Sequence, residues 1–296
     1  MYNFLIYMWF LFILLCLTNA AHLPKVDINN FLEHPALFNA SKPFIITNAV
    51  QYPKRTGSIK WLKKAYGERI ADFFRNNLDK QGAGLYLYTF EKALSELSPP
   101  QYLHLQLVPE DWTKLGLTIH PWFIREQWLK TLTPAQIEEF NIKTHWKVLL
   151  VGTPGAGMFN HSDGLRSSSW HLHVRGRKKW TICYHGNCTT DVLKPGEVLF
   201  YPKDYWHQTE CLENPTITVT DTIRTEENRL ALEGQFYKQC VSPQDEFLFS
   251  ASLCDGLEAA TGWNSWRDRA SEQTVEMRAS EKFLGNNYDG RNYITR

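Results

Sequence analysis

Two stretches of the chain decide the predicted fold, residues 155–163 (Gly-Ala-Gly-Met-Phe-Asn-His-Ser-Asp) and residues 196–207 (Gly-Glu-Val-Leu-Phe-Tyr-Pro-Lys-Asp-Tyr-Trp-His). The first stretch runs from a glycine to a His-x-Asp pair, and the second runs from a glycine through a proline to a histidine. Glycine and proline mark turns, while the residues between them suit short strands. The two stretches therefore predict paired strand segments that each end in side chains able to bind a metal.

The candidate metal ligands are His161, Asp163 and His207. Residues i and i+2 of an extended segment point to the same face, so that His161 and Asp163 can reach one ion. Two histidines and one carboxylate form the facial triad that holds Fe(II) and leaves coordination positions open for dioxygen chemistry. A His-x-Asp pair alone is more often turn or surface chemistry, so the assignment depends on the surrounding motifs.

Strand patterns dominate the middle of the chain. The predicted strands run from Trp146 to Val151, Ser169 to Tyr184, Glu197 to Tyr201 and Thr216 to Ile223, and Gly-containing turns punctuate them. Short strands separated by such turns indicate an antiparallel barrel or jelly roll. Upstream, the sequence predicts a strand at 42–47 and three helices that begin near Ser58, Thr89 and Thr133, each a residue type that caps helices.

The two stretches resemble the paired metal-binding motifs of cupins, and further segments resemble the Jumonji-C oxygenases. Gly176-Arg177-Lys178-Lys179-Trp180 is similar to the cofactor-binding strand of that family, and Lys194-Pro195-Gly196-Glu197 leads into its last metal ligand. The similarity covers roughly residues 40–225 and looks closest to the phosphatidylserine-receptor-type protein hydroxylases. It implies a mainly β fold with flanking helices, namely a double-stranded β-helix (cupin or jelly-roll barrel) with a helical N-terminal wrapping and a helical C-terminal tail.

The resemblance also implies a reaction, in which Fe(II) and 2-oxoglutarate hydroxylate a protein side chain with release of succinate and carbon dioxide. It implies that Lys178, Tyr102, Trp170 and His171 contact the cosubstrate. Two positions depart from the family pattern, because Met158 stands where a threonine is common and His171 where an asparagine is common. These departures favour the alternative of a metal-binding cupin-like module without oxygenase activity.

Lys178 has support from strand alternation. If residues 169–184 form one strand, Lys178 shares the apolar face with Trp170 and Trp180, whereas His171 and His173 lie on the polar face and are solvated. A lysine that faces a core is costly unless an anion meets it. A bulge at Gly176 or snorkelling of the side chain would instead turn Lys178 outward.

The N-terminal residues indicate a secretory signal. Residues 4–17 are apolar without interruption, and small residues follow up to Ala20, where cleavage is expected. The expected organisation is a signal peptide over 1–20, an oxygenase domain over 21–225 and a C-terminal helical extension over 226–296. No basic residue precedes the apolar run, so an uncleaved signal anchor stays open, although we expect no stable membrane anchor.

Secretion predicts the endoplasmic reticulum lumen or the outside of the cell. Five cysteines then remain, an odd number, so at least one thiol stays free or pairs with another chain. Sequons at Asn39 and Asn187 suit a glycoprotein, whereas the sequon at Asn160 adjoins a metal ligand.

The balance of charged residues restricts the classes of binding partner. Lys and Arg total 32 against 31 for Asp and Glu, which leaves no basic field for binding nucleic acid. We expect a protein or peptide substrate, with a small-molecule substrate left open. The C-terminal extension is either an appended helical region or the element through which a homodimer forms.

Overall fold

The computed structural model describes residues 22–33, 41–75, 85–95, 100–119, 131–144, 147–164, 167–223, 236, 239–240 and 249–261. The predicted signal peptide, the sequon at Asn39 and the tail beyond residue 261 lie outside these residues. No helix in the described ranges is long and apolar enough to cross a membrane.

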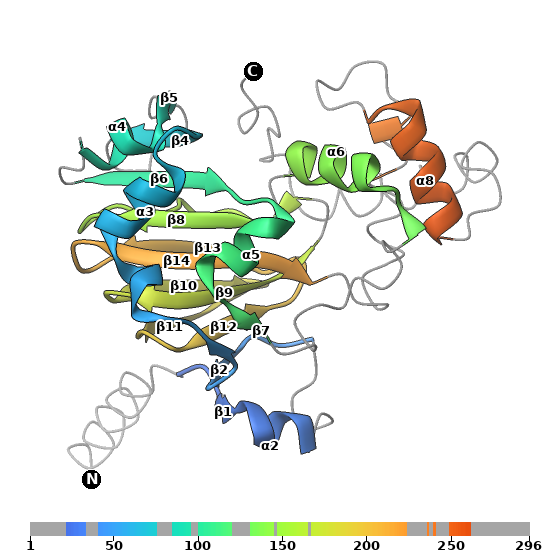
Figure 1. The fold of residues 1–296 in the computed structure, drawn as a ribbon. Helices are drawn as coiled ribbons and strands as arrows, with labels where there is room; N and C mark the ends of the chain where they lie inside the picture. Colours follow the sequence, from blue (N-terminus) through green and yellow to red (C-terminus); the bar gives the residue numbers. More distant parts are fainter. Residues whose placement is uncertain are drawn as a thin grey trace, which may run out of the picture.

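The described part of the chain is mainly β, with helices on one face (Figure 1). Its largest sheet has nine strands in the spatial order β1-β2-β12-β9-β14-β8-β6-β4-β5. These strands are β1 (Lys25–Asp27), β2 (Phe44–Thr47), β4 (Ile70–Arg75), β5 (Leu85–Thr89), β6 (Gln101–Gln106), β8 (Val148–Gly152), β9 (Ser168–Arg175), β12 (Val198–Tyr201) and β14 (Thr216–Ile223).

A smaller sheet faces this one. It has the order β11-β10-β13 and consists of β10 (Lys178–Tyr184), β11 (Asn187–Leu193) and β13 (Trp206–Cys211). A two-stranded sheet, β3 (Val50–Gln51) with β7 (Thr118–Ile119), lies beside them. Two facing sheets of mostly antiparallel strands make a jelly roll of the cupin kind, as the sequence predicted.

Apolar side chains fill both faces of the large sheet. On its outer face, Trp170, Leu172 and Phe200 pack against buried residues of the helices. On its inner face, Leu199 and Tyr201 pack against Trp180 and Ile182 of the small sheet. The helices of the first half of the chain are α2 (Ile28–Glu33), a 3-10 helix (Lys54–Gly57), α3 (Ile59–Tyr66), α4 (Phe90–Ser95) and α5 (Pro109–Leu115).

The helix starts that the sequence predicted are confirmed. The Ser58 hydroxyl accepts a hydrogen bond from the Trp61 amide at 3.3 Å and so caps α3. The Thr89 hydroxyl accepts from the Lys92 amide at the start of α4. Thr133 precedes Pro134, which opens α6 (Pro134–Thr144). The N-terminal wrapping is not purely helical, however, because β4, β5 and β6 extend the large sheet.

One long strand over residues 169–184 was a wrong prediction. Gly176 adopts the left-handed φ of 76° and turns the chain, so that β9 ends at Arg175 and β10 begins at Lys178 in the other sheet. A Cβ at Gly176 would also lie 2.8 Å from the Pro215 carbonyl oxygen. The turn places the two halves of the predicted strand on opposite walls of the barrel.

A helical pair lies beside the barrel. Figure 1 shows α6 next to α8 (Ala251–Thr261), and the Gln136 side chain of α6 donates to the Ser252 carbonyl at 2.6 Å. A disulfide joins Cys240 to Cys254 within the apolar cluster of this pair, and a second joins Cys183 to Cys188 across the β10–β11 hairpin. Cys211 is a buried free thiol, as the odd cysteine count predicted. Two disulfides are consistent with an oxidising compartment.

Candidate metal centre

The structure brings His161, Asp163 and His207 together. One ligand atom from each lies within 4.8 Å of the others. Asp163 Oδ1 is 3.7 Å from His161 Nε2 and 3.6 Å from His207 Nε2. His207 is nearly fully buried, whereas the side chains of His161 and Asp163 are 19% and 22% exposed. The three atoms therefore converge on one point that is open to solvent on one side.

Main-chain hydrogen bonds fix the two histidines. The His161 amide donates to the His207 carbonyl at 3.0 Å, and the His207 amide donates back at 2.7 Å. Each Nδ1 contacts the carbonyl of the residue two positions earlier, Phe159 at 2.8 Å and Tyr205 at 3.1 Å. Since a carbonyl only accepts, both Nδ1 atoms carry the proton and both Nε2 atoms present a lone pair.

Burial keeps His207 neutral. Burial, together with the neighbouring His161, lowers the pKa of His207 to about 4, although Asp163 opposes this shift. A metal binds the neutral imidazole, so no proton has to leave His207 near neutral pH.

The predicted cosubstrate lysine faces the barrel interior. Lys178 is 1% exposed, and its ammonium donates to the Tyr102 hydroxyl at 2.5 Å. No described carboxylate forms an ion pair with it. Burial lowers the pKa of Lys178 to about 8, while the Cys211 thiol opposes this shift. Lys179, its neighbour, is only partly buried and pairs with Glu210 at 2.7 Å. The predicted faces of these two lysines are thus confirmed.

His171 and His173 are buried, so the prediction that both are solvated was wrong. His173 is 0% and His171 8% exposed. They point from β9 into the barrel, because the apolar side chains of β9 face the helices instead. Burial lowers the pKa of His173 to about 3 and that of His171 well below its ordinary value, and the Lys178 charge adds to both shifts.

Trp170 lies away from the other predicted site residues. Its ring packs against Trp112 in the core under the helices, 5.9 Å between ring centroids. That face of β9 is opposite to the one that carries His171. The structure therefore brings together Lys178, Tyr102 and His171 with the triad, but not Trp170.

Met158 and Thr209 lie at the junction of the triad and the lysine. The Met158 amide donates to the Thr209 hydroxyl at 2.9 Å, and the Thr209 hydroxyl also interacts with Tyr102. Thr209 is two residues after His207 on β13, so it shares the face of that ligand. Sequence reasoning missed Thr209, although this spacing could have found it. Asp204, which stands where the cupin motif usually has glycine, has a φ of 67°.

A substitution at Gly157 is expected to disturb the site. A Cβ there would lie 1.9 Å from the Thr209 carbonyl oxygen, so Gly157→Ala must push residues 156–158 away from β13. We expect a loss of about 3 kcal/mol in the free energy of unfolding and weaker metal binding.

Denaturant unfolding measures the effect, and Gly164→Ala is the matched control because nothing lies within 4 Å of a Cβ there. The control should cost no more than about 0.5 kcal/mol. Equal stability of the two variants would contradict the packing described.

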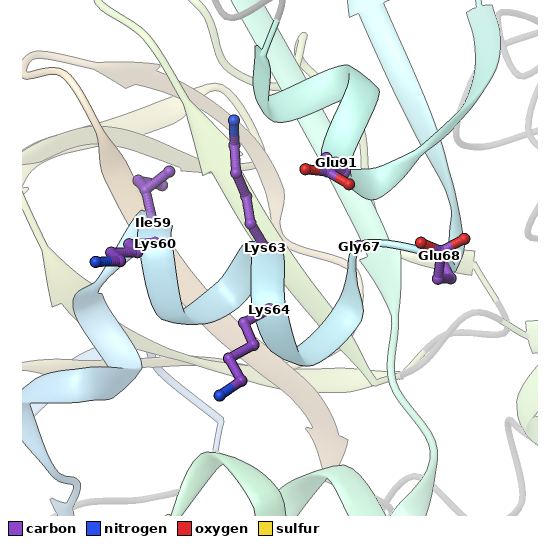
Figure 2. A pocket seen from close by; sticks show the side chains of 7 residues that line it. All are labelled: Ile59, Lys60, Lys63, Lys64, Gly67, Glu68 and Glu91. Carbon is purple, nitrogen blue, oxygen red and sulfur yellow. The ribbon is translucent and has the colours of Figure 1, made fainter.

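A surface cavity of about 600 Å³ lies elsewhere, beside α3 and α4 (Figure 2). Its three lysines point in different directions in Figure 2, and most of its charged residues are exposed. It shares no residue with the triad. We place the candidate site at the triad because, within the described ranges, it is the one group of metal-ligating side chains whose ligand atoms converge. The cavity is lined by Ile59, Lys60, Lys63, Lys64, Gly67, Glu68 and Glu91.

Fold and site together define a cupin-like jelly-roll protein with a His-Asp-His candidate metal centre. No protein-family model matches the sequence, and no curated protein sequence matches it. Among solved structures, three of the ribosomal oxygenase YcfD of Escherichia coli are similar, with TM-scores of 0.43, 0.45 and 0.42 at 13%, 15% and 14% identity.

These three alignments cover 79%, 79% and 89% of this chain and 65%, 66% and 69% of the others. The chain thus spans about 65% of the length of the first of them. Similarity of this degree leaves the interpretation of the site to its own geometry.

Proposed function

We propose that this protein is an Fe(II)- and 2-oxoglutarate-dependent oxygenase of the Jumonji-C type. The observation that carries the proposal is the pairing of a His-Asp-His triad with a buried lysine in one barrel. Many metal sites contain two histidines and a carboxylate, but a buried ammonium beside them calls for an anionic ligand.

The charge on Lys178 has an energetic cost that a ligand would explain. A pKa of about 8 in place of 10.5 corresponds to a cost on the order of 3 kcal/mol for holding the charge in the fold. Replacement by a hydrophobic residue would avoid this cost, so the lysine is better explained by binding than by stability. The far carboxylate of 2-oxoglutarate has the matching charge.

A second group in the barrel fits a carboxylate ligand. Trp180 Nε1 is buried and has no hydrogen-bond partner, and an indole nitrogen can only donate. Lys178 Nζ lies 5.2 Å from the centre of the same ring. Unpaired buried donors are rare in folded proteins, so Trp180 and Lys178 support an oxyanion in this part of the barrel.

The residues of the site would have separate roles. His161, Asp163 and His207 would hold the iron, and Lys178 with Tyr102 would orient the cosubstrate. With dioxygen, iron and 2-oxoglutarate supply the oxidation that hydroxylates a substrate carbon and yields succinate and carbon dioxide. Apolar neighbours such as Trp180 exclude water from His207.

We further propose a secretory-pathway enzyme that acts on a protein side chain. Asn187 lies exposed at the β10–β11 hairpin and can carry a glycan, whereas Asn160 adjoins His161. Mass spectrometry of protein from secreting cells should find cleavage after Ala20 and a glycan at Asn187. A glycan on Asn160 would contradict the placement of the site.

The alternative is a cupin-like module that binds a metal without oxygenase activity. Met158 favours it, because its thioether replaces a common cosubstrate-binding hydroxyl. Thr209 supplies a hydroxyl close by, which lessens the weight of this departure.

Turnover of 2-oxoglutarate without a second substrate distinguishes the oxygenase from the metal-binding module. Iron-loaded protein should convert 2-oxoglutarate to succinate slowly in air, whereas His207→Ala should not. If metal binds with normal affinity but no succinate forms under any condition that supplies ascorbate and oxygen, the alternative is favoured.

The binding of 2-oxoglutarate should depend on pH through Lys178. The protonated lysine attracts the carboxylate, and its pKa of about 8 is lowered by burial. Affinity should therefore be full well below pH 8, be about half of that at pH 8, and approach a tenfold fall for each further pH unit. Calorimetric titration between pH 6.5 and 9.5 measures this change, and an affinity that is constant over the range would contradict the role of Lys178.

A further inference from the structure

The two carboxylate oxygens of Asp163 have different surroundings. Oδ1 is directed to the point where the histidine Nε2 atoms converge, 3.7 Å from His161 and 3.6 Å from His207. Oδ2 accepts two hydrogen bonds, from the Ser169 hydroxyl at 2.5 Å and from the Tyr201 hydroxyl at 2.9 Å. Both of these hydroxyl groups therefore donate hydrogen bonds to Oδ2, and neither donates to Oδ1.

We propose that Tyr201 and Ser169 are positioning residues that hold Asp163 as a ligand through one oxygen only. The inference rests on the proposed function in that the metal is taken to be iron with a cosubstrate. A carboxylate that bound through both oxygens would occupy a fourth position of a six-coordinate ion. With Oδ2 engaged, three positions stay open, which is what a chelating cosubstrate and dioxygen together require.

Tyr201 is suited to this role because its side chain is buried and packed between neighbouring rings. It is 1% exposed, and its ring lies between His171 and His207, with ring centroids at 5.5 and 4.4 Å. It comes from β12, where its neighbour Leu199 packs in the same apolar cluster. Its hydroxyl is therefore presented to Asp163 from a rigid wall of the barrel.

Proton counting gives the direction of the bonds from Tyr201 to Asp163 and to His171. The Tyr201 hydroxyl also lies 3.3 Å from His207 Nε2, which carries no proton and can only accept. The single O–H of Tyr201 donates to Asp163, so the phenol oxygen accepts from His171 Nε2 at 3.0 Å. The Thr220 hydroxyl donates to the Trp170 carbonyl, so it also accepts from His171 Nε2, at 3.1 Å. His171 Nε2 thus carries the proton.

These hydrogen bonds indicate that His171 acts by orienting the Tyr201 hydroxyl. His171 Nδ1 is left as a buried lone pair without a partner, which does not suit direct contact with an ionised carboxylate. His171 instead keeps the Tyr201 hydroxyl turned toward Asp163. This explains why a histidine stands at a position where the resemblance led us to expect a direct cosubstrate contact.

The test uses metal binding, not turnover. Co(II) and Mn(II) are titrated separately into wild type, Tyr201→Phe, Ser169→Ala and the double variant, without 2-oxoglutarate. Loss of an outer hydrogen bond to a metal ligand costs tenfold to a hundredfold in affinity as a rough range, so we expect about tenfold or more for each single variant and more for the double variant. The Co(II) absorption spectrum of the double variant should change, because Oδ2 becomes free to bind.

Tyr66→Phe is the matched control. Tyr66 is also a fully buried tyrosine, but its hydroxyl has no partner and it lies in the core under the helices. It should bind Co(II) like wild type. Wild-type affinity and an unchanged spectrum in Tyr201→Phe would overturn the proposal, and so would an equal loss in Tyr66→Phe.

The outcome is independent of the proposed reaction. If wild type binds metal but never forms succinate, the proposed function fails while the metal titrations still decide the role of Tyr201. Thermal unfolding of each apo variant shows that it is folded before metal is added.

Discussion

Alanine at His161, Asp163 or His207 is expected to abolish tight binding of one Fe(II) per chain. Each variant leaves two ligands, and the mutual hydrogen bonds of the His161 and His207 main chains would keep the fold intact. We expect affinity to fall by more than roughly a hundredfold, since the loss of a direct ligand should exceed the loss of an outer hydrogen bond. Titration with Mn(II) under anaerobic conditions measures it.

His22→Ala provides the control for these variants. The His22 side chain is 78% exposed, and it lies near Asp191 instead of the triad. It should bind metal like wild type. Full metal occupancy in all three triad variants would show that the ion binds elsewhere.

Lys178→Ala is expected to weaken the binding of 2-oxoglutarate, while the affinity for the metal stays nearly normal. The lost charge-assisted contact is worth on the order of 1.5 to 3 kcal/mol, or about tenfold to a hundredfold in Kd. Lys178→Met should weaken 2-oxoglutarate binding to a similar extent. It should also be more stable than wild type, because it removes a buried charge. Calorimetry with iron replaced by Mn(II) gives the Kd.

Lys179→Ala is the matched control on the adjacent residue. Its side chain is partly exposed and pairs with Glu210 on the outside of β10, so the substitution should change the Kd by less than about twofold. If Lys179→Ala weakens binding and Lys178→Ala does not, the interior of the barrel does not hold the cosubstrate.

The triad could be predicted from the sequence because its signal is local. The spacing of His161 and Asp163 puts both on one face of an extended segment, and His207 follows a recognisable turn. The buried state of Lys178 was also predictable, since it alternates with Trp180 and Ile182 on β10, which all face the barrel interior.

The faces of β9 could not be predicted in the same way. Both of its faces are buried, one under helices and one in the barrel, so alternation alone does not tell which side is the interior. The apolar side is the outer one here, which put Trp170 away from the triad and brought His171 inside. The sequence pattern does not reveal that the interior face changes between β9 and β10. The chain turns at Gly176, but the alternation of apolar residues continues across the turn from Val174 to Trp180.

Strands β4, β5 and β6 were missed for a different reason. Their places at the edge of the large sheet depend on pairing over long sequence distances, such as Phe73 with Leu103. The local signals in this part of the sequence are helix caps, and the apolar residues between them show no clear period. Tyr102, at the start of β6, pairs with Gly152 of β8, and its hydroxyl accepts a hydrogen bond from Lys178.

A crystal structure of the protein with Mn(II) and 2-oxoglutarate, prepared without oxygen, tests the central claim most directly. The account predicts one ion bound by His161 Nε2, His207 Nε2 and Asp163 Oδ1, with the far carboxylate of the ligand on Lys178 Nζ and Asp163 Oδ2 still on Tyr201. An ion at other residues, or a ligand that leaves Lys178 bonded to Tyr102 alone, would contradict it.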